Sequence, residues 1–322
     1  MTRQLNRRAF VTSLACTGVA RGMLSGEVLK AEGQKEPLPI VDTHQHVWDL
    51  SKVRLPWLQS PSVKQLSRNF DMVDYARATR NVNVVKSVYI EATVHPDDQH
   101  KEAEYALQVC RQDNNPMVAA VIGGSPQKPT FAAYARKYAS NKYVKGVRAV
   151  LHHRSHPKGM CLESEFVNNI RLLGDLGMSF DLCMRPGELI DGAKLVDRCP
   201  QTRFVVDHCG KLSVQNTDKQ LRNQWEAGIK ALAGRDNVIC KISGVVWTAK
   251  SNWKPADLAD TVKPCLEAFG EDHVCFAGNW PVCRLKATFE EWVDALKTIV
   301  RDQSTQSQRK LFHDNAAKFY RL

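Results

Sequence analysis

The stretch IVDTHQHVWD, residues 40–49, decides the fold, because it joins a short apolar run to a group of polar side chains that follows at once. Short runs rich in β-branched or apolar residues recur along the chain after Pro39. Between them lie amphipathic segments whose apolar positions are three and four residues apart, as in helices. The chain therefore alternates predicted strands with predicted helices.

Eight strands are expected, at residues 40–46, 84–92, 118–123, 144–151, 178–184, 203–209, 238–243 and 274–279. Helices are expected at residues 99–112, 130–139, 163–176, 188–198, 218–232, 255–269 and 289–301, with a closing helix at 308–320. Eight such units with nearly continuous apolar strands predict an α/β fold, a (β/α)8 TIM barrel formed as one domain by residues 39–322. A doubly wound open sheet is the alternative, but no GxGxxG follows the first strand.

Residues 1–38 differ from the rest of the chain. The pair Arg7-Arg8 precedes a short apolar segment, residues 9–20, which gives way to Gly, Ser, Glu, Lys and Pro. This arrangement resembles a twin-arginine export signal, so we expect an export signal and linker here and a periplasmic protein. A disordered basic tail on a cytoplasmic protein and a lipid anchor at Cys16 are the alternatives.

The composition narrows the class of protein. No stretch approaches 18 consecutive apolar residues, so we expect no membrane span in the mature chain. The net charge is +11, but the Lys and Arg residues are interspersed with acidic residues, and no nucleic-acid motif accompanies them. This pattern favours a small-molecule substrate over nucleic acid. The ten cysteines are scattered without CxxC, and we expect buried free thiols. The oligomeric state stays open.

Polar residues gather at the ends of three predicted strands. In a TIM barrel the active site lies at the carboxyl ends of the strands. Strand alternation predicts that His44 and His46 point the same way, and that His208 shares a face with Val206 while Asp207 points to the other face. With Asn279, three histidines and an amide would then meet in one pocket, although an HxH pair alone is also common on solvated loops.

The polar residues stand in sequence motifs that resemble those of a known family. The stretches VKGVR (144–148), MSFDL (178–182), VVDHCGKL (205–212), VICKISGV (238–245) and FAGNWPV (276–282) follow the opening one in order. Together they closely resemble the amidohydrolase-related, metal-dependent hydrolases of the TIM-barrel superfamily over residues 38–322. The nearest branch is that of sugar lactonases, such as L-fuconolactonase and L-rhamnono-lactonase, and of pyrone dicarboxylate lactonases.

The resemblance implies roles for individual residues. His44 and His46 match the strand-one pair, His208 the strand-six histidine and Asn279 the strand-eight position, and these four are the expected catalytic residues. Arg148 is expected to hold a substrate carboxylate or carbonyl oxygen, with a salt bridge at the barrel rim as the alternative. Asp181 is expected to line the substrate site, with a structural hydrogen bond as the alternative. Glu91 is also expected to line the site, and the alternative is that it holds a neighbouring Arg or Lys.

One departure from the family bears on the chemistry. The family pattern at strand eight is GSDWP, whose aspartate acts as general base or metal ligand, but Asn279 cannot accept a proton from water. His44, His46 and His208 could hold Zn²⁺ or another divalent metal, and a metal-free site is an equal alternative. We expect a hydrolase that opens a sugar-acid or related lactone. A weakened lactone or sugar-acid binding protein, and decarboxylation or amide hydrolysis, are the other hypotheses.

Overall fold

The computed structural model describes residues 37–153 and 155–322, which form one compact unit, Pro37–Leu322. The predicted export signal and linker, residues 1–38, lie outside the described residues except for Pro37 and Leu38. No helix in the described part of the chain is long and apolar enough to cross a bilayer.

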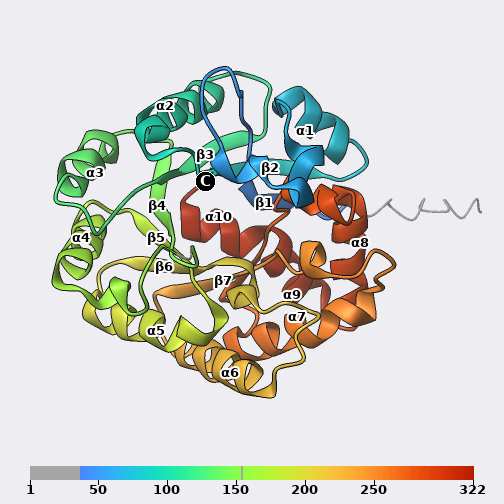
Figure 1. The fold of residues 1–322 in the computed structure, drawn as a ribbon. Coiled ribbons are helices and arrows are strands. Elements are labelled where there is room, and N and C mark those ends of the chain that lie inside the picture. Colours follow the sequence, from blue (N-terminus) through green and yellow to red (C-terminus); the bar gives the residue numbers. More distant parts are fainter. Residues whose placement is uncertain (1–36, 154) are drawn as a thin grey trace, which may run out of the picture. The chain divides into compact units, whose positions relative to one another are not determined.

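Eight parallel strands follow one another in sequence order around a barrel, seen in Figure 1 as a ring surrounded by helices. β8 returns to β1 through two backbone bonds, from Asn279 N–H to His44 O (2.7 Å) and from His46 N–H to Trp280 O (2.8 Å). The predicted TIM barrel is confirmed. The strands are β1 (Ile40–Gln45), β2 (Val84–Ile90), β3 (Met117–Gly123), β4 (Val144–Val150), β5 (Ser179–Cys183), β6 (Arg203–Val206), β7 (Val238–Ile242) and β8 (Val274–Phe276).

A helix follows each strand, and two more close the chain around a short π-helical segment, Lys310–Asp314. Short 3-10 segments precede most of the helices. The helices are α1 (Met72–Thr79), α2 (Gln99–Cys110), α3 (Phe131–Ala139), α4 (Ser164–Asp175), α5 (Leu189–Arg198), α6 (Lys219–Ala233), α7 (Pro255–Phe269), α8 (Phe289–Ile299), α9 (Thr305–Arg309) and α10 (Asn315–Tyr320).

The C-terminal helix α10 closes the barrel at the amino-terminal ends of the strands, and Figure 1 shows it across the ring. Its Ala316 and Tyr320 are fully buried against the inward-facing side chains of the strands. We call this cluster the barrel floor; its strand members are Val41, Val88, Ile90, Ala119, Val121, Val205, Ile239 and Cys275. The floor leaves only the carboxyl ends of the strands open to a substrate.

All nine cysteines in the described residues are buried and unpaired, as the sequence predicts for them. Burial raises the thiol pKa of several of them, including Cys275 to about 12 and Cys183 to about 11. A thiol with such a pKa stays protonated near neutral pH, and the thiolate is the reactive form. These cysteines therefore act as packing residues.

Candidate active site

A cavity of about 270 Å³ opens at the carboxyl ends of the strands, and we call it the mouth cavity. Four of the seven residues singled out in the sequence line it: His46, Arg148, His208 and Asn279. Apolar side chains form much of the remaining wall, together with Thr93, Cys183, Lys211 and two loop histidines. The apolar members and these histidines are Trp57, Val63, Ala92, Val150, Trp247, Val282, Leu285, His152 and His153.

His44 and His46 both point into the barrel, as strand alternation predicts. Their ring centroids are 4.9 Å apart, and that of His44 lies 4.4 Å from that of His208. A register shift between Asp42 and Gln45 interrupts the pairing of β1 with β2, so Thr43 also faces inward, with its hydroxyl 3.6 Å from Cys275 Sγ. His44 is fully buried behind the cavity wall, whereas His46 reaches the cavity.

The end of β6 differs from the prediction. Val205, not Val206, faces the barrel interior, and Asp207 follows it inward, so the expectation that Asp207 points away is wrong. β6 ends at Val206, and the next residues leave the strand conformation: His208 has φ 56° and Cys209 φ 50°. This left-handed turn brings His208 back to the mouth cavity beside Asp207.

Close packing around His208 fixes its ring. Its Nδ1 lies 2.8 Å from the Ser243 hydroxyl, at the end of β7. Gly244 has φ 68°, and a Cβ there would lie 2.5 Å from His208 Cβ. The Ser-Gly pair after β7 therefore holds the imidazole on one side and leaves room for it on the other.

Lys241 is a site residue that the sequence reasoning missed. It is fully buried in the barrel, with Nζ 2.6 Å from Asp181 Oδ2 and 3.1 Å from Asp207 Oδ1. Burial alone would lower its pKa, but the two carboxylates raise it well above the usual range. A lysine inside the apolar run VICKI was the signal, because a buried ammonium needs a counter-charge.

The two carboxylates that flank Lys241 have opposite pKa shifts. Burial raises the pKa of Asp181 to about 6, although Lys241 opposes this. Burial would also raise the pKa of Asp207, but Lys241 and neighbouring His44 hold it well below the usual range. Asp181 does not line the mouth cavity; it belongs to this buried network.

Arg148 is the second cation of the network. Its Nε and Nη2 donate to Glu91 Oε1 and Glu91 O, both at 2.6 Å, and its Nη1 lies 3.2 Å from both His44 Nε2 and Asp207 Oδ2. These contacts occupy four of the five N–H groups of a guanidinium. Glu91 thus holds Arg148, and one Arg148 donor remains for a molecule in the cavity.

The three site histidines are neutral near pH 7. Burial, reinforced by the Arg148 charge, lowers the pKa of His46 to about 3. Burial also lowers the pKa values of His44 and His208 well below the usual range. Neutral rings can accept a proton or bind a metal.

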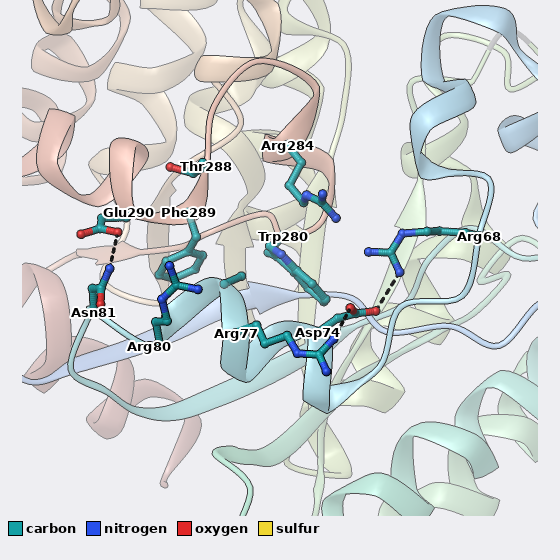
Figure 2. A pocket seen from close by; sticks show the side chains of 11 residues that line it. Arg68, Asp74, Arg77, Arg80, Asn81, Trp280, Arg284, Thr288, Phe289 and Glu290 are labelled. Atoms are coloured by element: carbon teal, nitrogen blue, oxygen red, sulfur yellow. Dashed lines mark hydrogen bonds and ion pairs between the residues drawn. The ribbon is translucent and has the colours of Figure 1, made fainter.

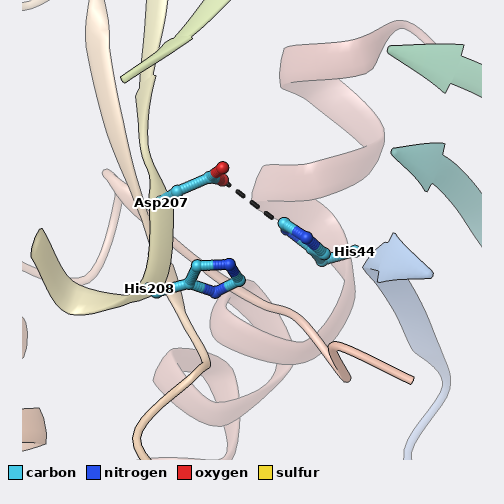
Figure 3. A group of neighbouring side chains, drawn as sticks. All are labelled: His44, Asp207 and His208. Atoms are coloured by element: carbon cyan, nitrogen blue, oxygen red, sulfur yellow. Dashed lines mark ion pairs between the residues drawn. The ribbon is translucent and has the colours of Figure 1, made fainter. Parts of the chain in front are cut away.

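His44, Asp207 and His208 offer ligand atoms that all lie within 4.8 Å of one another (Figure 3). His46, expected in this group, is not part of it. Two imidazoles and a carboxylate form a donor set suited to zinc, and His44 Nδ1 is buried without a hydrogen-bond partner in the described structure. The buried network also contains three carboxylates, those of Asp207, Asp181 and Glu91, but only two cations, Lys241 and Arg148. It therefore has one negative charge more than it has positive charges. The residues present therefore fit a divalent cation.

Comparisons with known proteins agree with this architecture. The family model described as Amidohydrolase matches residues 41–322. The protein y4mH of Sinorhizobium fredii is 27% identical over 301 residues, and L-fucono-1,5-lactonase of Burkholderia multivorans is 24% identical over 293 residues. Each alignment covers 88% of this chain, with 99% of y4mH and 96% of the lactonase.

A solved structure supports the fold independently. An amidohydrolase from Burkholderia multivorans with bound zinc superimposes with a TM-score of 0.78 at 22% identity, covering 88% of this chain and 99% of its own. The resemblance inferred from the sequence motifs is confirmed. The chain belongs to the amidohydrolase family of hydrolytic enzymes.

Proposed function

We propose that this protein hydrolyses a sugar-acid or related lactone by the attack of an activated water. The observation that carries the proposal is a pocket with an apolar wall in which a neutral histidine with a defined tautomer, His46, stands beside two cations, Arg148 and Lys211. The lactonase name of a relative that aligns over 88% of the chain supports the same class of substrate.

His46 is the proposed general base, and although its low pKa makes it a weak base, the same low pKa favours return of the proton to the leaving alkoxide. Its Nδ1 lies 2.7 Å from Ile90 O, and because a carbonyl oxygen only accepts, the ring proton must be on Nδ1. The Nε2 lone pair of the neutral ring is therefore free for a water molecule in the mouth cavity. Asn279 lines the same cavity, and because an amide cannot accept a proton, it can hold a water molecule or the substrate there but cannot act as the base.

Lys211 and Arg148 are the proposed partners of the carbonyl oxygen. Lys211 lines the mouth cavity and forms no ion pair with any carboxylate in the described residues, so its ammonium is available to a substrate. The free N–H of Arg148 adds a second donor. Positive groups aimed at the carbonyl stabilise the negative charge that develops as water adds to it.

One histidine, His46, both accepts the proton from water and returns it to the leaving group. Water loses a proton to His46 Nε2 as its oxygen bonds to the carbonyl carbon. When the tetrahedral intermediate collapses, the ring C–O bond breaks and the leaving alkoxide takes that proton from His46. The product is the open hydroxy acid.

His44, Asp207 and His208 would hold a divalent metal, which would supply a polarised water near neutral pH. Binding through His44 Nδ1 would move the ring proton to Nε2 and so replace the present contact with Arg148. The solved neighbour with bound zinc supports testing zinc first.

The absence of an aspartate at position 279 is the main argument for a binding protein without turnover. In this chain Asp207, fully buried at the end of β6, supplies a carboxylate to the candidate metal ligands. The strand-eight position then needs only to hold a water molecule or the substrate by hydrogen bonds, which an amide can do. This observation favours a working hydrolase over a weakened one.

The decisive experiment measures acid release from a panel of aldonolactones and aromatic lactones, beside Asn279→Asp and with metal content determined on the same samples. We expect wild-type turnover. Activity in Asn279→Asp alone would support the binding protein, and inactivity of both would exclude lactones as substrates. Zinc bound to wild type but lost from His208→Ala would support the metal set.

A further inference from the structure

A second cavity, of about 350 Å³, lies on the outside of the barrel and shares no lining residue with the mouth cavity. Figure 2 shows the side chains around it. They come from two segments far apart in sequence, one around α1 and one between β8 and the start of α8. The lining residues are Arg68, Asp74, Arg77, Ala78, Arg80, Asn81, Trp280, Arg284, Thr288, Phe289 and Glu290.

Four arginines surround this cavity against two carboxylates. Asp74 is shared: its Oδ2 lies 2.8 Å from Arg68 Nη1 and its Oδ1 3.9 Å from Arg77 Nη1. Glu290 accepts a hydrogen bond from Asn81 (3.0 Å). The cavity therefore has an excess of positive charge.

Two of the arginines have no acidic partner. Neither Arg80 nor Arg284 forms an ion pair with a carboxylate anywhere in residues 37–153 and 155–322. Arg284 lies over the ring of Phe70, at 5.4 Å from its centroid, which orients the guanidinium without using its N–H groups. These fork-shaped donors suit the oxygens of carboxylates and phosphates.

The floor of the cavity is aromatic, formed by Trp280 and Phe289. Trp280 is 1% exposed, and its indole nitrogen has no hydrogen-bond partner among the described residues. In Figure 2 its ring lies at the centre of the group, with Arg284 on one side and Arg77 and Asp74 on the other. The indole nitrogen is itself buried from solvent, so Trp280 offers the cavity its ring and not its N–H.

We propose that this cavity binds a small organic anion with two or more negative charges, through Arg80 and Arg284. The aromatic wall of Trp280 and Phe289 provides apolar contact for the rest of the ligand. A cavity of this volume takes a molecule of metabolite size. Carboxylates and phosphates share the required chemistry.

The test is calorimetric titration of the full chain with citrate and, separately, with pyrophosphate, and acetate serves as the singly charged comparison. We expect saturable binding of citrate, pyrophosphate or both, and no measurable binding of acetate. The double variant Arg80→Gln/Arg284→Gln should weaken binding by at least about tenfold, because both unpaired guanidinium groups are lost. Since both side chains are exposed and without ion pairs, the variant should keep the wild-type melting temperature.

A matched control removes the same charge elsewhere. Lys297→Gln/Arg301→Gln loses two exposed surface cations that line neither cavity, and should bind the anion as wild type does. Asp74→Asn should bind severalfold more tightly, because it removes a competing carboxylate from the cavity. Equal weakening in both double variants, or no binding of citrate or pyrophosphate to wild type, would overturn the proposal.

Discussion

The two ends of the barrel are built from the same eight strands but carry opposite kinds of side chain. At the amino-terminal ends, the barrel floor packs Val, Ile, Ala and Cys side chains against α10. At the carboxyl-terminal ends, histidine, lysine, arginine and carboxylate side chains form one connected network. Along a strand, an apolar inward-facing residue and the next inward-facing residue, which is charged, are only two positions apart.

Single strands make this change directly. On β6 the inward-facing Val205 is followed by Asp207, and on β7 Ile239 is followed by Lys241. On these two strands the earlier inward-facing residue packs in the barrel floor, and the next inward-facing residue belongs to the buried polar network. The comparison predicts that substitutions at the two ends will affect different measurements.

The largest effect should come from Lys241→Ala, where charge is buried deepest. Removing the ammonium leaves Asp181 and Asp207 buried without it, which should lower the free energy of unfolding by about 3–5 kcal/mol. Urea unfolding gives this value. Lys297→Ala, which breaks an exposed pair with Asp294, is the matched control and should cost less than about 1 kcal/mol. Similar losses in both variants would mean that the network does not stabilise the barrel.

His208→Ala should affect function far more than stability. Turnover of the best lactone should fall by at least about 100-fold, because the variant loses a member of the proposed metal set. The melting temperature should change little, since His208 borders the mouth cavity and water can replace the ring. His153→Ala, a more exposed histidine of the same cavity, should keep most of its activity. A large drop in melting temperature would instead make His208 a packing residue.

Ile239→Val tests the barrel floor. Removing one methylene group from this buried cluster should lower the free energy of unfolding by about 1 kcal/mol. The kcat and KM for a lactone should stay at wild-type values. A change in either constant would show that the floor also shapes the site.

A separate effect concerns the pH dependence of stability near the mouth. Glu102 accepts a hydrogen bond from Tyr89 (3.0 Å), and burial, with the nearby Glu91, raises its pKa to about 8. The native state keeps this proton up to about pH 8, whereas the unfolded chain releases it near pH 4.5. The contribution of Glu102 to stability is therefore lost as the pH rises through this window.

The variant Glu102→Gln has no such proton to lose. Its free energy of unfolding, relative to wild type, should increase between about pH 5 and about pH 9. Chemical denaturation at both pH values measures the difference. A difference that does not change with pH would contradict the raised pKa.

Much of the fold could be predicted from the sequence because its signals are local. The bounds of α7 match the prediction at both ends, since Pro255 opens the helix and Gly270 follows it. β6 and β8 end three residues earlier than predicted, because the backbone leaves the strand conformation before its left-handed residues His208 and Asn279. The helix α1 was missed because it is only eight residues long and buries only Tyr75 and Thr79.

The site was predicted less completely, for a geometric reason. The motifs led to His46, His208, Arg148 and Asn279, all of which the structure places at one cavity. Asp207 was given the wrong face, because the left-handed turn at His208 breaks the alternation on which that reasoning depended. Turns of this kind depend on packing against other strands, such as the Ser243–Gly244 segment, which one sequence does not reveal.

The most direct test of the account is kcat/KM for the best lactone with His46→Gln, compared with wild type at equal melting temperature. If the free Nε2 of His46 is the base, the value should fall by at least about 100-fold. A variant that keeps the wild-type value would contradict the proposed chemistry of the mouth cavity.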